Sequence, residues 1–126
     1  MNVLLQHLRQ LPYGRNTDRK NFSLVITEET GTCSSKHALV AQIGKLNNIP
    51  RVKLILAIYK MNKQNTPGIG DHIENADLEY LPEAHCYLSI NGESRDITKP
   101  SSDINKLLPD IPVSYTHLTL PTTPYV

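Results

Sequence analysis

The sequence has no tryptophan, one phenylalanine, two cysteines and no long apolar run. Two cysteines are too few for a disulfide framework, which favours a reducing compartment and predicts a cytoplasmic protein. No segment approaches the roughly 18 apolar residues of a membrane helix. Polar side chains interrupt the N-terminal segment where a secretion signal would need its apolar run.

The sequence also has little net charge. Thirteen Lys and Arg residues against twelve Asp and Glu residues give a formal net charge of +1. Such a balance lacks the strong positive field with which proteins bind nucleic acids or anionic membranes. We therefore expect no nucleic acid and no membrane among the partners of this protein.

The 126 residues suit one domain of ordinary size. Apolar residues at helical spacing predict an amphipathic helix over residues 2–11. A second helix is expected to begin at Thr32, a good N-cap residue, and to end before Asn47. A buried strand over residues 51–60 and a hairpin around Asn91-Gly92 follow. This order predicts an α+β domain, with the helices packed on one face of a largely antiparallel sheet.

Three further segments carry weaker patterns. The short run FSLVITEETG, residues 22–31, is expected to form a strand or an extended segment that ends at Gly31. Residues 61–80 are expected to form a long loop, and loops of that length inside a domain are usually functional. Residues 102–111 are expected to add a short helix that is capped by Ser102.

The end of the chain differs in composition from the rest. The run VSYTHLTLPTTPYV has no charged residue, two prolines and no sustained period. It resembles strings that are attached to unrelated reading frames in metagenomic assemblies, so we interpret residues 113–126 as a non-native or disordered tail, an assembly artefact. The alternative is a genuine, flexible Pro/Thr-rich tail. The domain itself is expected to span residues 1–112.

Cys33 follows Gly31-Thr32 at the predicted start of the central helix. The unpaired N–H groups and the positive dipole end at such a position stabilise a thiolate, the reactive form of cysteine. A nucleophile is therefore one interpretation of Cys33, and a small buried apolar side chain is the other. His37 shares the helix face of Cys33 and is expected on the helix surface.

The hairpin supplies a candidate base and a residue to orient it. The two-residue Asn-Gly turn sets a register that places Tyr87 opposite Asp96. His85 lies two residues from Tyr87, so its side chain is on the same face as Asp96 and within diagonal reach of it. Strand alternation therefore predicts a polar face that carries His85, Tyr87 and Asp96. Cys86 points to the opposite, apolar face and is expected to fill the core. The alternative for His85 and Asp96 is an exposed pair on the surface.

These runs of residues resemble a known superfamily. GTCSSKHAL, from Gly31 to Leu39, resembles the nucleophile block of the transglutaminase-like superfamily, and EAHCYLSINGESRDIT resembles its second and third blocks, which end in Asp-x-Thr. The resemblance implies a papain-like core, with the nucleophile helix packed on a small antiparallel sheet. It also implies that Cys33 is the nucleophile, His85 the base and Asp96 the residue that orients His85.

The same resemblance implies a cysteine hydrolase or acyltransferase that acts on a peptide or another amide through a thioester acyl-enzyme, with no cofactor and no metal. Position 87 is Tyr where the superfamily often has Trp, and no acidic loop resembles a calcium site. Both departures argue against calcium-dependent crosslinking. In the loop before Cys33, Asn16 and Tyr13 are candidates for an oxyanion-hole side chain.

Two alternatives remain open at this point. The first is a zinc site, because zinc is the usual metal for mixed cysteine and histidine ligands. The sequence lacks the paired Cys or His spacing that makes such an assignment specific. The second is a catalytically inactive superfamily member that binds peptides. The candidate zinc ligands are Cys33, His37, His72, His85 and Cys86.

Overall fold

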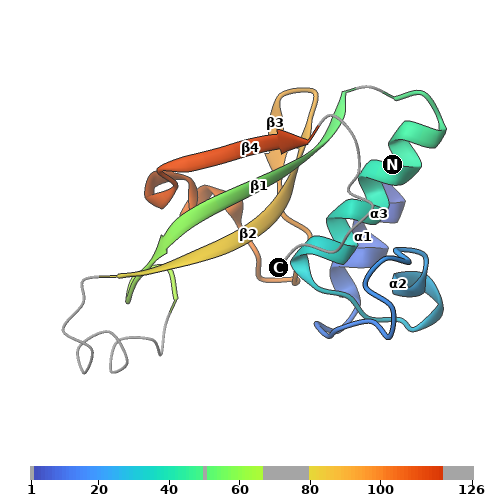
Figure 1. Cartoon of the computed structure of the whole chain (residues 1–126), viewed down its shortest axis with the longest axis horizontal. Helices are drawn as coiled ribbons and strands as arrows, with labels where there is room; N and C mark the ends of the chain where they lie inside the picture. Colours follow the sequence, from blue (N-terminus) through green and yellow to red (C-terminus); the bar gives the residue numbers. More distant parts are fainter. Residues whose placement is uncertain (1, 50, 67–79, 118–126) are drawn as a thin grey trace.

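The computed structural model describes residues 2–49, 51–66 and 80–117, and for His117 only the backbone (Figure 1). Within them, helices precede a four-stranded antiparallel sheet, so the predicted α+β class is confirmed. No helix in these ranges has the length and apolar character to cross a bilayer. The elements are α1 (Asn2–Gln10), α2 (Leu24–Thr27), α3 (Cys33–Leu46), β1 (Val52–Met61), β2 (Leu81–Ile90), β3 (Glu93–Arg95), the 3-10 turns η1 (Ile104–Lys106) and η2 (Leu108–Asp110), and β4 (Val113–His117).

The sheet has the strand order β3-β2-β1-β4 and buries a separate apolar cluster on each face. Helices α1 and α3 lie together on one side of the sheet (Figure 1), where Leu8 packs with Leu54 and Leu88. On the other face, Ile104 of η1 packs with Ile55 and Tyr87. The Tyr87 face of the hairpin was expected to be polar. Tyr87 is instead buried, because the segment containing η1 and η2 covers this face.

Helix α3 begins at Cys33, directly after the N-cap residue Thr32, which forms two reciprocal hydrogen bonds with Ser35. The Thr32 hydroxyl accepts the Ser35 N–H at 3.2 Å, and the Ser35 hydroxyl accepts the Thr32 N–H at 2.8 Å. This capping box satisfies N–H groups that a helix start leaves unpaired. A Cβ at Gly31 would lie 2.8 Å from Cγ of Lys36, so the residue before the cap needs to be glycine. The predicted cap and helix start are both confirmed.

The β2–β3 hairpin has the predicted register, with Ile90 paired to Glu93. Its turn residues Asn91 and Gly92 have φ values of 53° and 81°, as a two-residue type I′ turn requires. Strand β3 ends at Arg95, so the ladder stops opposite Leu88. Among the described residues, the earlier part of β2 therefore has no strand beside it on the β3 side. This open edge of β2 is where the site forms.

Two weaker predictions need correction. Residues 22–31 are not extended, since Leu24–Thr27 forms the short helix α2, in which Val25 is buried. The side chain of Asn21 accepts the Ser23 N–H and favours a turn over a strand there. Residues 102–111 form two 3-10 turns rather than one helix, and η1 is capped by Asp103 instead of Ser102. Most of the predicted loop 61–80 lies outside the described residues.

Strand β4 also differs from expectation, because an irregular tail was predicted from residue 113 onward. Val113–His117 pairs antiparallel with β1 between Ile58 and Leu54. Alternating Val, Tyr and polar residues suit an edge strand. The side chains of residues 113–116 are nonetheless exposed, so main-chain pairing holds the strand. Residues 118–126 lie outside the described part of the chain.

Deletion of residues 113–126 is expected to leave a cooperatively folded domain, with a melting temperature within a few degrees of that of the full chain. The main-chain bonds of β4 contribute about 0.5–1.5 kcal/mol each, and ordering the strand costs about 1–2 kcal/mol per residue. The two terms nearly cancel because the β4 side chains bury little. Thermal unfolding followed by circular dichroism tests this, and a truncated chain without a cooperative transition would contradict it.

Candidate active site

Cys33 is the first residue of α3 and lies where that helix meets the sheet. Its half-buried side chain packs against the core under the helix and lines a cavity of about 560 Å³. His85, Asp96 and Tyr13 line the same cavity. The structure therefore brings the three predicted catalytic residues to one place, with the thiol beside the positive end of a helix dipole.

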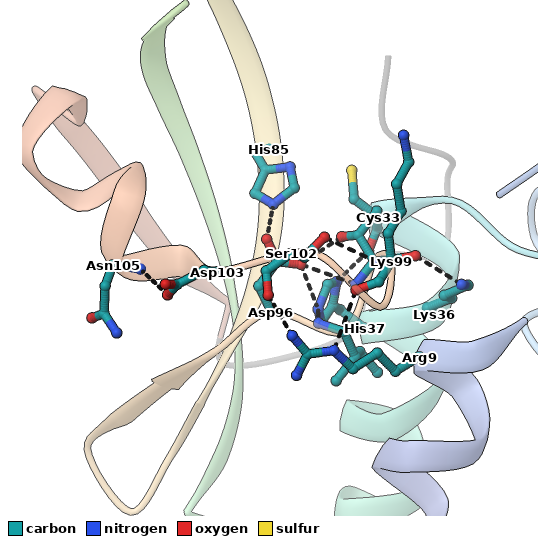
Figure 2. Close-up of polar contacts among 12 residues, drawn as sticks. Arg9, Cys33, Lys36, His37, His85, Asp96, Lys99, Ser102, Asp103 and Asn105 are labelled. Carbon is teal, nitrogen blue, oxygen red and sulfur yellow. Dashed lines mark hydrogen bonds and ion pairs between the residues drawn. The ribbon is translucent and has the colours of Figure 1, made fainter. Parts of the chain in front are cut away.

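His85 and Asp96 form a hydrogen-bonded pair (Figure 2). Nε2 of His85 lies 2.7 Å from Oδ2 of Asp96, which is nearly fully buried. The other carboxylate oxygen, Oδ1, accepts the Thr98 N–H at 3.0 Å and the Thr98 hydroxyl at 2.6 Å. The Asp-x-Thr motif thus has a physical meaning, because Thr98 fixes one carboxylate oxygen and leaves the other for His85.

The pair is charged at neutral pH. Burial alone would lower the pKa of His85, but its hydrogen bonds to Asp96 and to Cys33 raise that pKa to about 9. Burial would raise the pKa of Asp96, but the hydrogen bond and the charge of His85 hold it well below its ordinary value. His85 is therefore an imidazolium, and its second ring nitrogen points toward the Cys33 side of the site (Figure 2).

Cys33 is held as a thiolate by two neighbours. A hydrogen bond from the Cys86 thiol is the largest cause that lowers the pKa of Cys33, and the hydrogen bond and charge of His85 add to it. Together they outweigh burial, which disfavours the charge. The pKa of Cys86 is raised in turn, because its thiol keeps the proton that it donates. Cys86 fills the core as predicted, and Cys33 packs against that core.

His85 and Cys86 point to opposite faces of the sheet, because they are consecutive in β2 and side chains alternate along a strand. Strand β3 does not pair with this part of β2, since it pairs only with Leu88–Ile90. Cys33 packs against the core that contains Cys86 and lines the cavity that His85 also lines.

His37 lies in a different environment from the one predicted. It was expected on the helix surface, but its side chain is fully buried. Nε2 of His37 accepts the Ile97 N–H at 2.8 Å, so the ring proton is on Nδ1, which donates to the Cys33 carbonyl at 2.5 Å. Burial lowers the pKa of His37 to about 4, which keeps the ring neutral.

The residues that follow Asp96 are fixed by side chains from two helices (Figure 2). Lys36, which is also buried, donates to the Thr98 carbonyl at 2.8 Å and to the Leu11 carbonyl at 2.7 Å. Arg9 of α1 donates to the Lys99 carbonyl at 3.2 Å and also to the Ser102 carbonyl. We call residues 96–102 the anchored segment. The spacing of Lys36 and His37 after Cys33, at i+3 and i+4, was the available signal for this role.

The two oxyanion-hole candidates lie in different places. Tyr13 lines the cavity beside Cys33, where its main chain bridges to Gly31. Burial and the nearby Cys33 charge raise the pKa of Tyr13, which keeps its phenol protonated. The Asn16 amide instead donates to the Thr30 carbonyl and to Glu28, at 2.9 and 3.1 Å, and Asn16 is not part of the cavity wall. The structure therefore brings only Tyr13 to the thiol.

The zinc alternative receives no support from the geometry. Within residues 2–49, 51–66 and 80–117, no group of three or more His, Cys, Asp or Glu side chains is arranged to hold a metal ion. His37 and His85 already use ring nitrogens in hydrogen bonds with Ile97 and Asp96. His72, another of the candidate ligands, lies outside the described residues.

Comparison with protein-family models, with curated proteins and with solved structures gave no match in any of the three. The resemblance of the three sequence blocks to the transglutaminase-like superfamily therefore stays a prediction.

We expect iodoacetamide to alkylate Cys33 much faster than Cys86 at neutral pH, because Cys33 is a thiolate at a cavity wall and Cys86 is a buried thiol. The Cys33 rate should stay high as the pH falls below the ordinary thiol range. Peptide mass spectrometry of the full chain measures both rates. In Cys86→Ala the acid limb should move to higher pH, since one donor to the sulfur is lost. Equal rates for the two cysteines would contradict the assignment.

Replacement of His37 by leucine is expected to lower the free energy of unfolding by about 2–5 kcal/mol, because the Cys33 carbonyl and the Ile97 N–H each lose a buried partner. Urea unfolding measures this loss. His7→Leu, at an exposed position of α1, is the matched control and should change little. His37→Asn should recover part of the loss, since an amide has both a donor and an acceptor. Similar stability of His37→Leu and His7→Leu would refute the bridging role.

Proposed function

We propose that this protein is a cysteine-dependent hydrolase or acyltransferase with a transglutaminase-like, papain-like core that acts on a peptide or another amide. The observation that carries this proposal is the hydrogen bond between Asp96 and His85 at the wall of a cavity that Cys33 also lines. The pKa shifts favour an imidazolium at His85 and a thiolate at Cys33. The packing of α3 on an antiparallel sheet supports the proposed core. A reducing compartment, which keeps the thiol free, fits this chemistry.

The proposed reaction begins with attack of the Cys33 sulfur on the substrate carbonyl carbon. N–H groups of the first helical turn have no intrahelical partner and stabilise the negative charge that develops on the carbonyl oxygen, with Tyr13 as a further donor. His85 gives its proton to the leaving amine as the carbon–nitrogen bond breaks, which leaves a thioester on Cys33. The buried Asp96 holds the His85 ring in the orientation that this transfer needs.

Water completes the proposed hydrolysis. Neutral His85 takes a proton from water, and the oxygen attacks the thioester carbonyl. The carbon–sulfur bond breaks, the carboxylic acid leaves, and the thiolate–imidazolium pair is restored. An amine in place of water gives acyl transfer by the same steps.

Incubation with p-nitrophenyl acetate tests this proposal. We expect a burst of nitrophenolate and one acetyl group on Cys33, seen by intact and peptide mass spectrometry, followed by slower turnover. Cys33→Ser and His85→Ala should lose the burst, whereas His7→Ala, which removes an exposed histidine, should keep it. Absence of acetyl-Cys33, although Cys33 alkylates readily, would refute the enzyme and leave a peptide-binding protein.

The pH profile supplies a second readout of the same proposal. The leaving group needs the His85 proton, and the folded pKa of His85 is about 9, so activity should persist through neutral pH and fall as the pH rises through about 9. Asp96→Asn removes the partner that contributes most to this raised pKa, and the alkaline fall should move to lower pH. An unmoved alkaline limb in Asp96→Asn would exclude Asp96 from its proposed role.

A further inference from the structure

The cavity beside Cys33 contains a cation that the proposed acyl transfer does not use. Lys99 lines this cavity together with Cys33 and Tyr13, and Lys99 is exposed to solvent. Its ammonium lies over the Tyr13 ring, with Nζ 5.1 Å from the ring centroid. Within residues 2–49, 51–66 and 80–117, no carboxylate forms an ion pair with Lys99. The ammonium is therefore available to a ligand in the cavity.

The main chain holds Lys99 and Tyr13 in place near the start of α3. The Lys99 N–H donates to the Ser102 hydroxyl at 3.0 Å, and the Lys99 carbonyl accepts from the Arg9 guanidinium at 3.2 Å. Tyr13 pairs with Gly31, which directly precedes the N-cap of α3. The ring that carries the ammonium is therefore fixed close to the first residue of that helix. In Figure 2 the Lys99 side chain and the thiol extend in the same direction.

The cavity also contains other charged side chains outside the proposed triad, namely Lys106, Glu83 and Asp103. Asp103 accepts the Asn105 N–H at 3.0 Å and so serves as the N-cap of η1. Glu83 belongs to β2, and in the part of the chain that the structure describes neither acid pairs with Lys99. A carboxylate that enters the cavity can therefore pair with Lys99 without displacing an acid of the protein.

The position of Lys99 relative to His85 indicates which part of a substrate it would contact. In the view of Figure 2 the Cys33 thiol lies between the His85 ring and the Lys99 side chain. His85 has to face the leaving amine, because it supplies the proton in the proposed reaction. Lys99 then lies on the side of the acyl group.

We propose that Lys99 is a specificity-determining residue, which binds a carboxylate on the acyl part of the substrate. An ammonium is a compact cation with three donors, and its hydrogen bonds to a carboxylate are charge-assisted. The favoured substrate is an amide whose acyl chain carries a carboxylate, as an acidic side chain does. This inference rests on the proposed acyl transfer for its reaction, but anion binding beside Cys33 is measurable without that reaction.

Alkylation of Cys33 by iodoacetate and by iodoacetamide tests the anion binding alone, since the two reagents are similar in size and only iodoacetate carries a carboxylate. We expect Lys99→Gln to lower the ratio of the iodoacetate rate to the iodoacetamide rate by about two- to fivefold at low salt, the effect of an exposed ion pair. Lys60→Gln is the matched control, because Lys60 Nζ lies 5.0 Å from the centroid of the Tyr80 ring and does not line the cavity. An unchanged ratio in Lys99→Gln would overturn the proposal.

Acylation by the p-nitrophenyl esters of adipic, hexanoic and aminohexanoic acid tests the same preference in the proposed reaction. At the far end of equally long acyl chains, these esters carry a carboxylate, a methyl group and an ammonium. We expect wild type to acylate Cys33 fastest with the adipic ester and slowest with the aminohexanoic ester, and Lys99→Gln to lose most of this order. A preference that Lys106→Gln abolishes and Lys99→Gln keeps would overturn the assignment to Lys99.

The two tests separate this inference from the proposed function. Three esters that acylate Cys33 at equal rates would overturn the inference and leave the function intact. No acyl-Cys33 with any ester, together with an iodoacetate ratio that depends on Lys99, would refute the function and retain the anion site. Lys99→Gln is expected to fold like wild type, because Ser102 and Arg9 contact the main chain of Lys99 and not its side chain.

Discussion

The buried His37 imidazole joins the two halves of the site, because it donates to the carbonyl of Cys33 on α3 and accepts the N–H of Ile97 next to Asp96. Asp96 lies beyond the end of β3, so strand pairing does not position it. Its place comes from the anchored segment, which Lys36 and Arg9 also hold by main-chain carbonyls. Asp96 orients His85. The geometry of the proposed triad therefore depends on contacts of His37, Lys36 and Arg9, which are not part of the triad.

Burial decides the charges in this region. His37 has no acid as a hydrogen-bond partner, and burial keeps it neutral, although Oδ1 of Asp96 is only 3.6 Å from its Nε2. His85 is also largely buried, but its hydrogen bond to Asp96 outweighs that penalty, and it keeps a proton. Two histidines near one carboxylate thus take opposite protonation states, one suited to structure and the other to proton transfer.

The short length of β3 has a chemical consequence as well as a topological one. Because β3 ends at Arg95, Asp96 leaves the ladder and forms hydrogen bonds with His85 and Thr98. Cys33, at the start of α3, lines the same cavity as His85 and Asp96. The proposed acyl transfer thus depends on where the hairpin ladder ends.

The sequence by itself determined the features that depend on neighbouring residues. These were the N-cap at Thr32 that starts α3 at Cys33 and the register of the β2–β3 hairpin, because caps and turns act over a few residues. Only the tertiary structure decided the burial of His37, the position of Asp96 and the pairing of β4. Each of these depends on which elements pack together across many residues of sequence, and local patterns do not encode that choice.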